Sequence, residues 1–109
     1  HVGFKNNALN SAVALAGLAV TAGAGAIVCS PLEIAAIRAA VGTTPIIITP
    51  GVRPADSSPA DDQVRTMTPK AAIDSGANFV VIGRPITQRW SSGASAMRER
   101  AAEIAGELL

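Results

Sequence analysis

Hydrogen-bonding and charged side chains gather at the ends of two short apolar runs. The segment TPGVRP at 49–54 leaves the first run through a Pro-Gly turn and presents Arg53, while IGRP at 82–85 ends the second with Gly83 and Arg84. A glycine lets a ligand approach the backbone closely, and a guanidinium can donate two parallel hydrogen bonds to phosphate oxygens. The two segments together predict a binding site for a phosphate monoester.

A long polar connection lies between these two segments. It runs from Pro50 to Met67 and contains Gln63 beside Arg65. Connections in compact domains usually have about 2–6 residues, so one this long is typical of a functional or a disordered segment. We interpret it as a mobile lid with anion-binding groups at its two ends.

Each of these side chains also has a simpler interpretation. Taken alone, Arg53 could be a surface arginine paired with a nearby aspartate, and Gln63 a solvated loop residue. Arg84 follows a run of residues expected to be buried, and a buried arginine is costly without an anionic partner. The adjacent carboxylates Asp61 and Asp62 point in different directions from a loop, which argues against a catalytic pair.

The composition limits the classes of protein to consider. The chain has 109 residues, 49% of them hydrophobic and 3% aromatic, with a formal net charge of +1. That length allows at most one domain, and the lack of a basic run argues against nucleic acid or an anionic membrane as partner. The single cysteine, Cys29, lies in an apolar run and is expected to be a buried packing residue in a cytoplasmic protein. The Ala-rich stretch 8–28 is interrupted by polar residues and glycines, so no membrane span is expected.

Short apolar runs alternate with helical stretches along the whole chain. The expected strands are 26–29, 45–49 and 78–82, and the expected helices are 7–22, 30–41, 68–76 and 94–108. Ser30-Pro31 and Thr68-Pro69 each place a capping residue before a proline, and Glu33 completes a capping box with Ser30. Continuous apolar runs indicate strands buried on both faces, and alternation with helices predicts a parallel sheet.

Three parallel strands cannot close a barrel. As an open sheet they would leave two unpaired edges and one bare apolar face, because the helices can cover only the other face. A (β/α)8 barrel typically needs about 250 residues. We therefore expect residues 1–109 to form one α/β half-barrel, with three parallel strands and four flanking helices, that pairs with further polypeptide. Trp90 is expected to pack under the last loop.

The order and spacing of several motifs resemble one enzyme family. TPGVRP followed by DDQVRTMTPKAAIDSGANFVVIGRPIT resembles the C-terminal signature of bacterial orotidine 5′-phosphate decarboxylases, and GAGAIVCSPLEI resembles their sixth strand and the helix after it. The resemblance covers essentially the whole chain. It implies the C-terminal half of a TIM barrel that forms uridine 5′-monophosphate (UMP) and CO2 from orotidine 5′-monophosphate in pyrimidine biosynthesis, without a metal or an organic cofactor.

The resemblance also implies roles for individual residues. Gln63 would bridge the phosphate and the pyrimidine, Arg53, Gly83 and Arg84 would hold the phosphate, and Pro50 would lie near the base. The family's catalytic lysines and aspartates belong to its first four strands, so no catalytic residue is assigned here and this chain alone is expected to be inactive. The expected partners are the nucleotide substrate, the missing N-terminal half and a homodimer partner.

Two alternatives remain open at this point. The first is a related phosphosugar decarboxylase or epimerase barrel, which shares the phosphate site but, so far as the resemblance goes, lacks the long arginine–glutamine connection. The second is a half-barrel without catalytic activity that binds phosphate or serves as a scaffold.

Overall fold

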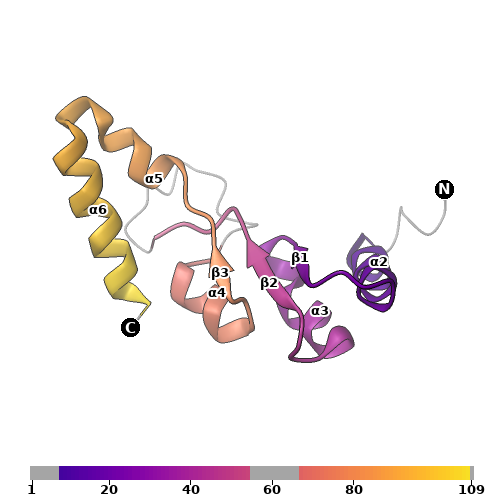
Figure 1. The fold of residues 1–109 in the computed structure, drawn as a ribbon. Helices are drawn as coiled ribbons and strands as arrows, with labels where there is room; N and C mark the ends of the chain where they lie inside the picture. Colours follow the sequence, from indigo (N-terminus) through magenta and orange to yellow (C-terminus); the bar gives the residue numbers. More distant parts are fainter. Residues whose placement is uncertain (1–7, 55–66, 109) are drawn as a thin grey trace.

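The computed structural model describes residues 8–54 and 67–108. The order of the elements is α2 (Ala8–Thr21), β1 (Ala26–Val28), the 3-10 helix η1 (Pro31–Glu33), α3 (Ile34–Val41), β2 (Ile46–Thr49), α4 (Pro69–Ser75), β3 (Phe79–Val80), α5 (Arg84–Thr87), the 3-10 helix η3 (Gln88–Ser92) and α6 (Ala94–Glu107) (Figure 1). The three predicted strands and the four predicted helical stretches all form, in the predicted order.

The three strands form one parallel sheet in the order β1-β2-β3. Ile27 lies opposite Ile47 in the register of β1 and β2, and Ile48 lies opposite Phe79 in that of β2 and β3. Figure 1 shows α2 and α6 at opposite ends of this sheet. The predicted parallel topology is confirmed.

The two faces of the sheet have different surroundings. Ile47 and Thr49 are fully buried and, with Cys29, face a core that α2, α3 and α4 complete through Ala16, Ile34, Ile37 and Ala72. The alternate side chains are 41% to 68% exposed: Val28, Ile46, Phe79 and Val81. The predicted bare apolar face is therefore present. The prediction that the strands are buried on both faces is wrong for the described residues, because a layer of helices covers only one face.

The two predicted helix starts form to different extents. At α4 the Thr68 hydroxyl accepts a hydrogen bond of 3.1 Å from the Ala71 N–H, and a proline occupies the first helical turn, as predicted. At the earlier start, the Ser30 N–H donates to Glu33 Oε1 at 3.1 Å, whereas the Ser30 hydroxyl caps no N–H group. Half of the predicted capping box is formed, and the chain begins this helical stretch with a 3-10 turn.

The segment after β3 departs from the prediction. A polar connection was expected before the last helix, but the chain forms α5 and η3 there, which brings the α-helices of the described residues to five. Trp90 of η3 is 65% exposed, so the prediction that it packs under the last loop is wrong. The reason is that η3 packs against α5 and α6 and away from the sheet.

One arginine ties the N-terminal edge of the sheet together. Arg38 of α3 donates hydrogen bonds to four residues around this edge: the carbonyl oxygens of Gly42 (2.9 Å), Pro45 (2.7 Å) and Gly76 (2.7 and 3.2 Å), and Oδ1 of Asn78 (2.8 Å). The same Asn78 oxygen accepts from the Ile47 N–H at 2.8 Å. Arg38 thus links the ends of α3 and α4 to the starts of β2 and β3.

Candidate functional site

A cleft of about 310 Å³ opens at the carboxyl ends of β2 and β3. Its lining comes from the residues that follow each strand: Pro50, Gly51, Val52 and Arg53 after β2, and Val81, Gly83, Arg84 and Pro85 after β3. Four of the five predicted site residues, Pro50, Arg53, Gly83 and Arg84, therefore line the same cleft. They meet because parallel strands end at the same edge of the sheet, the edge at which barrel enzymes build their sites.

The first wall of the cleft is a turn anchored in the core. Gly51 has φ of 80°, a conformation that favours glycine, and Val52 after it is buried. Arg53 is half-buried, and its backbone N–H donates a hydrogen bond of 2.8 Å to the Met67 carbonyl. Burial of Val52 therefore fixes the backbone from which Arg53 extends.

The second wall of the cleft begins at Gly83. Apart from Gly83 and the residues next to it in the chain, the described residues place no atom within 4 Å of the point where a side chain at Gly83 would begin. The Gly83 carbonyl accepts hydrogen bonds from the N–H groups of Ile86 (2.9 Å) and Thr87 (3.0 Å), which fixes the chain as it enters α5. Packing within the described residues does not require a glycine here, and the open space leaves its backbone accessible to a ligand.

Arg84 is more exposed than the sequence predicts. The prediction placed it after a strand buried on both faces, where it would need an anion to offset desolvation. The structure instead places Arg84 on an exposed rim, because β3 is an edge strand and the neighbouring Val81 is half in solvent. The argument from burial therefore fails. What remains for Arg84 is its place in one cleft with Arg53 and Gly83.

Part of the predicted site lies outside the described residues. Gln63, Arg65, Asp61 and Asp62 all fall within 55–66. The predicted lid and the predicted role of Gln63 therefore stay predictions, as does the alternative pairing of Arg53 with an aspartate of that segment.

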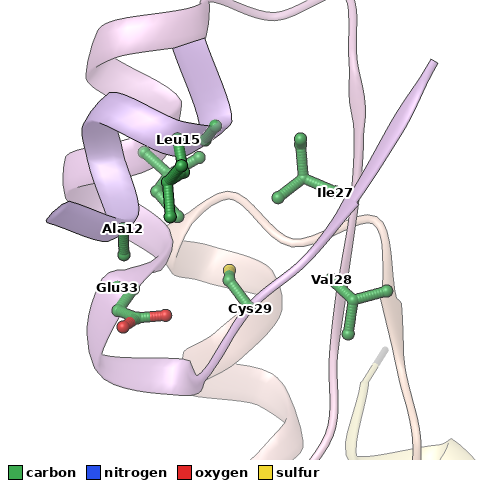
Figure 2. Close-up of a pocket in the computed structure, with 8 residues that line it drawn as sticks. Ala12, Leu15, Ile27, Val28, Cys29 and Glu33 are labelled. Atoms are coloured by element: carbon green, nitrogen blue, oxygen red, sulfur yellow. The ribbon is translucent and has the colours of Figure 1, made fainter. Parts of the chain in front are cut away.

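Cys29 borders a second hollow, of about 290 Å³, between α2 and β1. Figure 2 shows Ile27 and Cys29 on the side of α2, with Val28 pointing away. Burial raises the pKa of the Cys29 thiol above its ordinary value and the Glu33 carboxylate adds to this, while the Arg38 guanidinium acts in the opposite direction. A buried thiol that keeps its proton is a poor nucleophile, which supports the predicted packing role.

Residues 8–54 and 67–108 contain no group of three or more His, Cys, Asp or Glu side chains that could hold a metal ion. Within the same ranges, no helix is both long enough and apolar enough to cross a membrane.

Parallel strands joined through helices that cover one face, with a cleft at the carboxyl ends, are the arrangement expected of part of a (β/α)8 barrel. The chain is similar to the crystal structure of orotidine 5′-phosphate decarboxylase from Lactobacillus acidophilus, with a TM-score of 0.64 and 31% sequence identity. The likeness covers 95% of this chain and 44% of that one. The predicted fold class is confirmed.

The model of the orotidine 5′-phosphate decarboxylase / HUMPS family matches residues 4–99, and the chain belongs to this family. It is 50% identical over 107 residues to the orotidine 5′-phosphate decarboxylase of Thermobifida fusca, covering 98% of this chain and 43% of the relative. It is 57% identical over 74 residues to that of Anaeromyxobacter dehalogenans, covering 68% and 32%. The resemblance seen in the motifs is confirmed, and the chain spans less than half the length of these relatives.

Proposed function

We propose that this chain supplies the phosphate-binding loops of an orotidine 5′-phosphate decarboxylase, which forms UMP and CO2 in de novo pyrimidine biosynthesis. The observation that carries the proposal is the convergence of Arg53, Gly83 and Arg84 on one cleft, in a chain of this family. The matched relatives named above carry the same enzyme name.

The cleft has the chemistry that a phosphate monoester requires. Its described lining includes two arginines, one on each wall, and no acidic side chain. A phosphate dianion between them would accept charge-assisted hydrogen bonds, which are roughly twice as strong as neutral ones. The open backbone at Gly83 lets a phosphate oxygen come close, and Pro50, which also lines the cleft, would lie beside the pyrimidine.

The proposed contribution of this chain is binding energy applied far from the reacting carbon. Contacts to a remote phosphate can be used to position the reacting group and to drive closure of the site. Gln63 is proposed to bridge the phosphate and the pyrimidine. The lysines and aspartates that act on the substrate's carboxylate would come from the part of the relatives' length that this chain does not span, and the reaction would need neither a metal nor an organic cofactor.

The proposal extends to the state of the whole protein. We place residues 1–109 in one half-barrel that is inactive by itself and works together with the N-terminal half of the barrel in a homodimer. A cytoplasmic location fits the free thiol of Cys29, the single cysteine of the sequence.

Two measurements test this function. The chain titrated with UMP and with uridine should bind UMP far more tightly, because the two ligands differ only in the phosphate. Co-expression with the N-terminal part of the Thermobifida fusca relative should then give turnover of orotidine 5′-monophosphate. Equal affinity for UMP and uridine would contradict the phosphate site, and a stable complex without turnover would contradict the enzymatic role.

A further inference from the structure

We propose that Thr49 is a positioning residue for the cleft, a role that rests on the proposed function. Its side-chain hydroxyl replaces a backbone hydrogen-bond donor that Pro50 cannot supply, and its carbonyl holds the second wall in place. Thr49 thereby connects all three strands at the level where the cleft begins.

The hydrogen-bond pattern of a parallel sheet identifies the missing donor. In such a pair, one residue bonds through its N–H and its C=O to the two residues that flank its partner. The Cys29 N–H donates to the Ile48 carbonyl at 3.1 Å, so the Cys29 carbonyl should accept from the N–H of residue 50. Residue 50 is proline and has no N–H.

The Thr49 hydroxyl takes over this bond. Its Oγ1 atom donates to the Cys29 carbonyl oxygen at 2.7 Å, whereas the Pro50 carbonyl oxygen is farther away, at 3.4 Å. Cys29 and Thr49 are both buried, and a buried Cys29 carbonyl without a partner would be costly. The hydroxyl therefore lets the chain place a proline at the cleft and still keep β1 joined to β2.

The backbone of Thr49 holds the other side of the cleft. Its carbonyl accepts a hydrogen bond of 2.9 Å from the N–H of Val81. Val81 lines the cleft two residues before Gly83, and Pro50 begins the opposite wall. Because both walls start from Thr49, a shift of this residue would change the separation of Arg53 and Arg84. Binding groups have to be held within about 0.5 Å of their productive positions.

The test compares two substitutions that differ in the hydroxyl. Thr49→Val keeps the volume and removes the donor, whereas Thr49→Ser keeps the donor. Binding is compared at a temperature where circular dichroism shows both variants folded. Thr49→Val should then weaken binding of UMP and of inorganic phosphate by about tenfold, because the free energy of one hydrogen bond no longer holds the cleft in its binding geometry. Thr49→Ser should stay within about threefold of the unsubstituted chain. The matched control is Thr44→Val, at an exposed threonine ahead of β2.

A merely structural role would lower the melting temperature of Thr49→Val and leave the affinity of the folded protein unchanged. That result would overturn the inference while leaving the proposed function intact. If the unsubstituted chain bound neither UMP nor phosphate, the proposed function would fail and this inference with it, so the two failures are distinguishable.

Pro50→Ala provides a second, independent test because it restores the missing N–H at residue 50. The change Thr49→Val should cost less affinity in the Pro50→Ala background than in the presence of the proline, and equal costs would overturn the inference. If Thr49→Val alone does not fold, recovery of folding in the double variant Thr49→Val/Pro50→Ala supports the inference, because the restored N–H of residue 50 then replaces the lost Thr49 hydroxyl. A double variant that also fails to fold counts against it.

Discussion

Arg53 and Arg84 line the cleft from opposite walls, so two residues of like charge border the same open volume. Their mutual repulsion is weak in solvent and falls further when an anion lies between them. In the proposed function a phosphate dianion interacts with both guanidinium groups, so we expect the pair to favour a phosphorylated nucleoside over the nucleoside itself. Comparing the affinities for UMP and for uridine therefore tests whether an individual arginine binds the phosphate.

Arg84→Ala should weaken UMP binding by about tenfold to a hundredfold, since a hydrogen bond to a charged group contributes about 1.5–3 kcal/mol. Uridine binding should not change, because the lost contact is to the phosphate. Isothermal titration calorimetry with both ligands measures the difference. Arg89→Ala is the matched control, because Arg89 is an exposed arginine of η3 that is not part of the cleft lining. Equal losses for UMP and uridine would remove Arg84 from the phosphate site.

Cys29 should respond to pH in a direction fixed by its raised pKa. The folded protein holds the thiol proton more tightly than the unfolded chain, whose thiol has an ordinary pKa of about 8.5. The stability that this contributes is complete below that pH and is lost as the pH rises through the folded value. Urea unfolding from pH 7 to 10 should show an alkaline decline that is smaller in Cys29→Ala. The same decline in both proteins would refute a role for the thiol.

The residues of the cleft could be predicted because each follows a strand whose end is visible in the sequence. Arg53 and Gly83 needed only the apolar runs and the rule that parallel strands end together, whereas Pro50 was assigned from the resemblance to the family. Thr49 was missed because its role depends on the register of β1 against β2. The prediction put Arg84 at the end of the correct strand but expected it to be buried. Its exposure depends on whether a further strand pairs with β3, which the local sequence does not show.

At the scale of elements, the carboxyl and amino ends of the strands differ in what they contribute to the molecule. The carboxyl ends of the strands carry the cleft, while Arg38 connects the N-terminal ends through hydrogen bonds to carbonyl groups. Apolar runs, periodicity and caps predicted the three strands and four of the five α-helices of the described residues, but neither α5 nor this connection. Arg38 and Gly76 are 38 residues apart, and only the folded structure brings them together.

Arg38→Lys should lower the free energy of unfolding by about 2–4 kcal/mol, because a lysine keeps the charge but cannot reach the same set of acceptors with a planar fork. Urea denaturation measures the loss. Arg98→Lys, at an exposed arginine of α6, should change the stability little. The selectivity of the folded variant for UMP over uridine should be unchanged, since Arg38 lies at the opposite end of the sheet. A variant as stable as the unsubstituted chain would show that the hydrogen bonds of Arg38 contribute nothing net.

At the scale of the whole molecule, the described chain is an incomplete barrel. It spans 43% of the Thermobifida fusca relative and 44% of the similar crystal structure. The sequence predicted this incompleteness by counting strands, because three parallel strands leave two edges and one face uncovered. It did not predict which side chains form the bare face, since continuous apolar runs do not show which alternate residues face the helices.

The bare face, formed by Val28, Ile46, Phe79 and Val81, should make the isolated chain either bind a dye for exposed apolar surface or associate with itself. Fluorescence of such a dye and sedimentation over a range of concentrations measure the two outcomes. Replacing both Phe79 and Val81 by serine should reduce the dye binding or the self-association. The loss of stability should be small, because these side chains are already largely in solvent.

The control for this experiment is a residue on the other face of the same sheet. Ile47→Ser should unfold the chain or lower its stability by about 2–5 kcal/mol, since Ile47 is fully buried against the helices. The difference between the two sets of variants distinguishes the exposed face of the sheet, which further polypeptide would cover, from the face that already packs in the core. An isolated chain that is monomeric and binds no dye would mean that the sheet is covered on both faces, and the half-barrel would then be the wrong description of this molecule.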